Sequence, residues 1–175
     1  MIKEENGYKY IEEGEGESLI LLHGLFGALS NFQDVIDYFK GSFKVIFPFL
    51  PLYDLSLRKS TVTGMVEHLS SFVAHKKYTN FHLLGNSLGG HIAQVYALDN
   101  ITKVKSIILT GSSGLFENSL GDGYPNKESY TYVKNKTELT FYDPKTATKE
   151  LVDEIFETVN NRSICHYDYI VKKLF

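Results

Sequence analysis

Short apolar runs alternate along the chain with stretches in which apolar residues recur every three or four positions. The runs are typical of buried strands, and the recurring stretches are typical of helices that cover a sheet. Strands are predicted at 18–22, 43–47, 81–84 and 104–110, and helical stripes at 32–39, 62–73 and 93–97. Strands that alternate with helices imply right-handed crossovers, and therefore a mostly parallel, doubly wound α/β sheet.

The two ends of the chain depart from this alternation. Residues 8–12 alternate weakly and precede a Gly-spaced acidic turn at 13–17, which predicts a hairpin into the strand 18–22. From residue 115 onward the chain is rich in Tyr, Asn, Lys and Glu, and its clearest pattern is one amphipathic helix from Ala147 to Val159. We therefore divide the chain into a core, residues 1–114, and a C-terminal segment, residues 115–175.

The strongest candidate for chemistry is Gly85-Asn86-Ser87-Leu88-Gly89, where an apolar run passes through a tight turn into a helix of small residues. A serine that projects from the end of a sheet needs a sharp turn, and side chains at Gly85 and Gly89 would collide with the backbone as the chain reverses. Ser87 is therefore the candidate nucleophile. The backbone N–H of Leu88, at the start of the helix, is placed to stabilise the oxyanion that its attack creates.

A second motif, His23-Gly24-Leu25-Phe26-Gly27, follows the strand 18–22. Together the two motifs resemble the α/β-hydrolase family, in its serine esterase-like branch. The resemblance implies that Ser87 is the nucleophile and that the backbone N–H groups of Leu25 and Leu88 form the oxyanion hole. The resemblance also implies that five residues support the two turns: His23, Gly24, Gly27, Gly85 and Gly89. A serine at this position argues against the Asp-nucleophile dehalogenases and epoxide hydrolases of the same family.

The resemblance extends over about residues 7–161 and places residues 115–175 as a helical cap with a divergent tail. The expected fold is thus a sheet of the α/β-hydrolase type, truncated after the start of the cap. Five aromatic residues of this segment either line an acyl pocket or only pack the cap together, and the sequence leaves both open: Tyr124, Tyr130, Tyr132, Phe141 and Tyr142.

A serine hydrolase of this family also needs a histidine base and an acid, which follow the serine in chain order. His91 lies on the same helix as Ser87 and is directed away from the turn. His166 has the right chain order, with Asp143 or Asp153 as its acid, but its surroundings match no motif of the family. We therefore expect a truncated or altered-frame version of a longer hydrolase, whose catalytic competence the sequence leaves open.

Composition and charge exclude several classes of function. The 175 residues are 43% hydrophobic and 22% charged, with a net charge of −3, which is ordinary for a globular domain and offers no basic face for nucleic acid. The sequence shows no signal peptide and no membrane-length apolar run, so we expect a cytoplasmic protein without membrane contact. Cys165 is the only cysteine, and neither a metal nor a cofactor is expected.

The leading hypothesis is a serine hydrolase that acts on a small carboxylic ester or thioester. The alternatives are a non-catalytic binding protein or fragment that retains the pocket and oxyanion hole, and a relative that performs a cofactor-free lyase or transferase reaction. If no strand follows 104–110 in the sheet, that strand becomes an apolar edge, and the chain is expected to self-associate through it.

Overall fold

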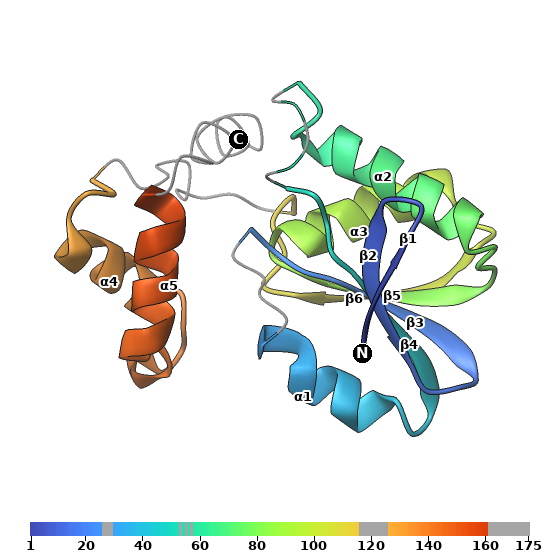
Figure 1. Cartoon of the computed structure of the whole chain (residues 1–175), viewed down its shortest axis with the longest axis horizontal. Coiled ribbons are helices and arrows are strands. Elements are labelled where there is room, and N and C mark those ends of the chain that lie inside the picture. The colour runs from blue at the N-terminus through green and yellow to red at the C-terminus, as the bar shows by residue number, and fades with distance from the viewer. Residues whose placement is uncertain (26–29, 53, 55, 57, 116–125, 161–175) are drawn as a thin grey trace. The chain divides into compact units, whose positions relative to one another are not determined.

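The structure is a computed structural model, which describes residues 1–25, 30–52, 54, 56, 58–115 and 126–160. The chain forms two compact units, Met1–Phe116 and Glu117–Phe175. The first unit contains a six-stranded sheet with helices on both faces, and the second contains helices (Figure 1). The mostly parallel α/β fold predicted from the hydrophobic pattern is confirmed.

The sheet has the strand order β1-β2-β4-β3-β5-β6. Its strands are β1 (Ile2–Glu5), β2 (Tyr8–Glu13), β3 (Glu17–Leu22), β4 (Phe43–Pro48), β5 (Phe81–Asn86) and β6 (Val104–Thr110). The strands β3, β4, β5 and β6 are parallel, whereas β1 and β2 form an antiparallel hairpin that pairs with the outer side of β4. Ser87 and the start of the upstream motif, His23-Gly24-Leu25, therefore follow the carboxyl ends of neighbouring parallel strands, β5 and β3, which is where open α/β sheets bind ligands.

Among the described residues, three helices cover the sheet. Helix α1 (Ser30–Phe39) lies on one face, and α2 (Val62–His75) and α3 (Leu88–Asp99) lie on the other (Figure 1). The stripe predicted for α2 is its buried face, which consists of Met65, Val66, Leu69, Phe72 and Val73. Under α1, buried apolar side chains of three strands form a second core layer with Phe32 and Ile36. Burial of apolar area on both faces stabilises the layered arrangement.

The predicted hairpin between 8–12 and 18–22 is wrong. Strand β2 pairs with β1 and β4, and β3 lies between β4 and β5 at the centre of the sheet. The hairpin is instead β1–β2, and its turn is Asn6-Gly7, both with positive φ (49° and 79°). This is the conformation that a two-residue hairpin loop requires, and Asn-Gly is the pair that adopts it most readily.

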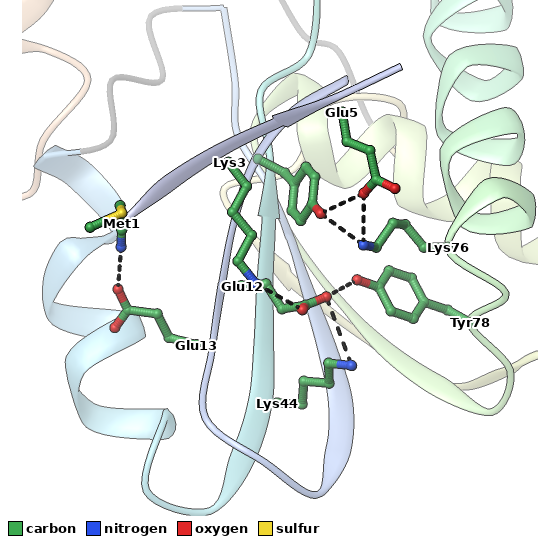
Figure 2. A network of polar contacts seen from close by, with 9 residues as sticks. Met1, Lys3, Glu5, Glu12, Glu13, Lys44, Lys76 and Tyr78 are labelled. Carbon is green, nitrogen blue, oxygen red and sulfur yellow. Dashed lines mark hydrogen bonds and ion pairs between the residues drawn. The ribbon is translucent and has the colours of Figure 1, made fainter. Parts of the chain in front are cut away.

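The two edges of the sheet differ in charge. Strand β1 carries Lys3, which contacts Glu12 at 3.1 Å, while the N-terminal ammonium contacts Glu13 at 3.0 Å (Figure 2). Burial alone would raise the pKa of Glu12, but hydrogen bonds from Tyr78 and Lys3 lower it. Glu12 is therefore ionised within a network that joins β1, β2 and the segment before β5. In contrast, β6 is largely exposed and apolar.

The second unit contains α4 (Tyr130–Glu138), a short 3₁₀ helix, η1 (Pro144–Thr146), and α5 (Lys149–Asn160). Helix α5 corresponds to the predicted amphipathic helix and buries Val152, Ile155 and Val159. Within this unit, Tyr130 packs against the ring of Phe156 with 5.3 Å between centroids. Helix α4 was not predicted.

Candidate active site

Ser87 occupies the turn between β5 and α3 in a strained backbone conformation. Its φ of 53° and ψ of −121° are unfavourable for a residue with a side chain. Backbone hydrogen bonds hold it there: the Ser87 N–H donates to Thr110 O (3.1 Å), and Ser87 O accepts from the N–H groups of Gly90 (3.0 Å) and Ser113 (3.2 Å). The segment at the end of β6 thus holds the backbone of Ser87 from both sides.

The two glycines around Ser87 are required by close approach of the backbone. A Cβ atom on Gly85 would lie 2.4 Å from Gly89 O, and one on Gly89 would lie 2.0 Å from Leu22 O. Both distances are shorter than non-bonded carbon–oxygen contacts in proteins. The first turn of α3 therefore packs against the ends of β5 and β3 so closely that there is no room for a side chain. This close packing lifts Ser87 to the end of the sheet.

The structure brings the upstream motif next to the serine. A Cβ atom on Gly24 would lie 3.0 Å from Ser87 Cβ and 3.4 Å from Ser87 Oγ. Leu25 is described and half-buried, whereas Phe26 and Gly27 lie outside the described residues. Leu88 is the first residue of α3, a position whose N–H has no acceptor within its own helix.

His23 is a structural residue of this loop. Its ring is buried, the Leu50 N–H donates to Nε2 (2.9 Å), and Nδ1 lies 2.8 Å from Gly24 O. Since Nε2 accepts, Nδ1 carries the proton and donates to Gly24 O. Burial lowers the pKa of His23, so the ring stays neutral, with both nitrogens occupied. It holds the Gly24 carbonyl and is not available as a base.

The buried neutral ring of His23 predicts a loss of stability in mild acid. Below about pH 6.5 the unfolded chain binds a proton that the folded chain excludes. The free energy of unfolding therefore decreases as the pH is lowered, by up to about 1.4 kcal/mol per pH unit. Above that pH the contribution is constant. Burial lowers the pKa of His68 as well, which adds a change of the same sign.

Chemical denaturation between pH 5 and 7.5 measures this dependence. The slope should be shallower in His23→Gln than in the wild type, because glutamine does not titrate. Equal slopes in the two proteins would contradict the assignment of a buried neutral ring at position 23.

The side chains of the other described histidines have other surroundings. His68 and His75 on α2 pack against Tyr8, and the ring nitrogens of His82 contact Ser106 and Glu17. His91 lies one turn into α3, and its Nδ1 is buried without a hydrogen bond among the described residues. Within the described part of the chain, no histidine is hydrogen-bonded to Ser87 Oγ. His166 lies outside it.

The two candidate acids have other partners. Asp143 caps η1, because its Oδ1 accepts from the Lys145 N–H at 3.0 Å. Asp153 accepts a hydrogen bond from the Tyr130 hydroxyl at 2.7 Å and pairs with Lys149 on α5. Both carboxylates therefore have structural roles in the second unit.

The side chains that fasten the turn at Ser87 to the segment after β6 were not predicted from the sequence. The Gln94 side-chain amide donates to Ser112 Oγ (2.9 Å), Ser113 O (3.2 Å) and Gly90 O (3.2 Å), and thereby fastens the segment after β6 to α3. Asn86 Nδ2 donates to Thr110 O at 2.9 Å. The only sequence signal was the polar run at 111–114 directly after a strand.

The described residues contain neither a cluster of metal ligands nor a helix of membrane length. No group of three or more His, Cys, Asp or Glu side chains there is arranged to hold a metal ion. No helix in the same ranges is both long and apolar enough to cross a bilayer.

Comparison with known proteins agrees with this geometry. A family model described as alpha/beta hydrolase fold matches residues 17–140. A solved structure with 38% sequence identity to this chain is the crystal structure of MGS-MChE2, an alpha/beta hydrolase enzyme from a sediment metagenome of the lagoon of Mar Chica, Morocco. Its TM-score is 0.75, and the alignment covers 99% of this chain and 65% of that one.

Two curated relatives have different activities in their names. The dihydrolipoyllysine-residue acetyltransferase component of the acetoin cleaving system of Cupriavidus necator is 26% identical over 84% of this chain. Monoacylglycerol lipase ABHD6 of Mus musculus is 29% identical over 58% of it. The chain spans 41% and 32% of the length of these two proteins.

Proposed function

Since the chain belongs to the alpha/beta hydrolase family, we propose that it cleaves small carboxylic esters or thioesters with Ser87 as the nucleophile. One observation carries the proposal: the strained conformation of Ser87, with Gly24 of the upstream motif against its hydroxyl. Strain of this kind persists at functional sites because the surrounding structure holds it in place. Here the backbone hydrogen bonds of Thr110 and Ser113 supply that support.

The proposed reaction proceeds in two steps. Ser87 Oγ attacks the carbonyl carbon and loses its proton, and the alcohol or thiol leaves with a proton, which produces an acyl-serine. Water then attacks the same carbon and releases the carboxylic acid and free Ser87. In each step the carbonyl oxygen carries a negative charge, which we propose is stabilised by the backbone N–H groups of Leu88 and Leu25.

The hydrogen bonds of His23 support the Leu25 N–H as a donor to the oxyanion. The trans peptide between Gly24 and Leu25 directs the Leu25 N–H opposite to the Gly24 carbonyl. Because His23 Nδ1–H holds that carbonyl, it also fixes the direction of the Leu25 N–H. A fixed donor costs no reorganisation when the oxyanion forms.

A second candidate function is binding without turnover. It is favoured by one observation: in the described residues, Ser87 Oγ has no histidine partner to take its proton. Removal of one member of a catalytic triad abolishes most turnover and leaves the oxyanion hole and the binding site in place. Such a protein would hold an ester or acid in the same site.

A fluorophosphonate probe separates the two candidates, because it modifies only a serine with an activated hydroxyl. We expect one probe per chain in intact-protein mass spectrometry, located at Ser87 by peptide mapping, and no labelling of Ser87→Ala. The matched control is Ser71→Ala on the exposed side of α2, which should label like the wild type.

Labelling that survives in Ser87→Ala would refute Ser87 as the nucleophile. If the folded wild type is not labelled but binds a p-nitrophenyl ester without hydrolysing it, the chain is a binding protein and not a hydrolase.

A further inference from the structure

The segment that follows β6, residues 112–114, lies against the first turns of α3. A Cβ atom on Gly90 would lie 2.4 Å from Ser112 Oγ, and one on Gly114 would lie 2.5 Å from His91 Cδ2. The backbone of the helix therefore contacts the side chain of Ser112, and the ring of His91 contacts the backbone of Gly114. The segment and the helix are in direct contact at two places.

Gln94 supplies the polar part of this contact. Its Nε2 donates to Ser112 Oγ (2.9 Å), Ser113 O (3.2 Å) and Gly90 O (3.2 Å). Two of these acceptors are backbone carbonyls, which have no proton to give, and the Ser112 hydroxyl already donates to Ser113 O at 2.8 Å. Position 94 therefore needs a side chain that donates hydrogen bonds.

The same segment holds the backbone of Ser87. The Ser113 N–H donates to Ser87 O at 3.2 Å. Gln94 binds the side chain that precedes this N–H and the carbonyl that follows it, so it fixes the direction of the N–H from both sides. The φ of 53° at Ser87 is unfavourable and persists only while the surrounding structure holds it.

We propose that Gln94 is a positioning residue for the reaction of Ser87. Its amide docks residues 112–114 on α3, and the docked segment keeps the turn at Ser87 in its strained conformation through the Ser113 N–H. This role rests on the proposed function of Ser87, whereas the docking of the segment can be measured without any reaction.

Gln94→Glu tests the role most sharply, because it keeps the size of the side chain and changes only its capacity to donate. An ionised carboxylate would face three acceptors, whereas a protonated carboxyl can donate to one of them. At about pH 8 we expect a fluorophosphonate to label Ser87 at least about tenfold more slowly in this variant than in the wild type, since small displacements of a reacting group are costly.

The ratio of the two labelling rates should rise toward one as the pH is lowered to about 5.5. Partial burial beside carbonyl oxygens raises the pKa of the introduced carboxyl, so that it is increasingly protonated over this range. A ratio near one at every pH, or a low ratio that does not change with pH, would overturn the proposal.

Gln94→Met removes the donor without adding a charge, and should slow labelling to a similar extent at every pH. The matched control is Gln33→Met on α1, where the lost hydrogen bond joins the amide to Asp37 of the same helix at 3.0 Å. It should label like the wild type. A merely structural role of Gln94 would lower the stability in urea but leave the labelling rate of the folded protein unchanged, and that result would also overturn the proposal.

Amide hydrogen exchange followed by NMR separates this role from the proposed function. A wild type that is not labelled at all refutes the proposed function, and the docking is then decided by exchange alone. In Gln94→Met the Ser113 amide should exchange at least about tenfold faster than in the wild type, while the amide of Ile20 in the central strand β3 should change by a much smaller factor. An unchanged rate at Ser113, or equal factors at Ser113 and Ile20, would show that Gln94 does not hold the segment.

Discussion

Gly89→Ala should destabilise the protein by about 3 kcal/mol or more, or prevent it from folding. The new methyl group would lie 2.0 Å from Leu22 O and 2.7 Å from His23 O. Both are backbone atoms at the end of a central strand, so the clash cannot be relieved by rotation of a side chain. Urea denaturation followed by circular dichroism measures the change.

The matched control is Gly41→Ala in the turn before β4. A Cβ atom at Gly41 meets nothing within 4 Å, and its backbone does not need positive φ. We expect a change within about 0.5 kcal/mol for this variant. Equal stability of the two variants would show that α3 does not cross the end of β3 as closely as the structure has it.

His23→Ala should lower the free energy of unfolding by about 4 kcal/mol. The substitution leaves the Leu50 N–H and the Gly24 carbonyl without their partners and opens a cavity against Phe47, whose ring stacks on His23 at 5.5 Å. It should also slow the labelling of Ser87 by a fluorophosphonate, since the upstream loop then loses its anchor.

His75→Ala provides the comparison for this variant, because the ring of His75 is partly exposed on α2. We expect a cost of about 1 kcal/mol or less and an unchanged rate of labelling. If His23→Ala were as mild as His75→Ala, His23 would not be the residue that organises the loop.

The elements that a local pattern determines could be predicted. The period of the apolar residues identified α2 and its buried face, because burial on one side of a helix imposes that spacing. Strand β1 was missed because Ile2-Lys3-Glu4-Glu5 has no apolar alternation, and only the Asn6-Gly7 pair indicated a hairpin. Helix α4 was missed for a similar reason, since it buries only Val133 and Thr137.

In the candidate site, too, only the features that depend on local sequence could be predicted. The glycine spacing predicted the turn at Ser87, because a sharp reversal is a local property of the chain. The support from Thr110, Ser113 and Gln94 could not be predicted, since these hydrogen bonds join segments that only the folded sheet brings together. Similarly, the sequence could not tell that His23 bonds to Leu50, which determines its tautomer.

The Ser87 N–H donates to Thr110 O and the Ser113 N–H donates to Ser87 O, so the proposed nucleophile is tied to β6, the outermost parallel strand among the described residues, and to the segment that follows it. Peripheral strands open by local fluctuation more readily than central ones. The backbone conformation of Ser87 therefore depends on β6 staying paired with β5. Partial opening of β6 would break these hydrogen bonds while the central strands of the sheet remained paired.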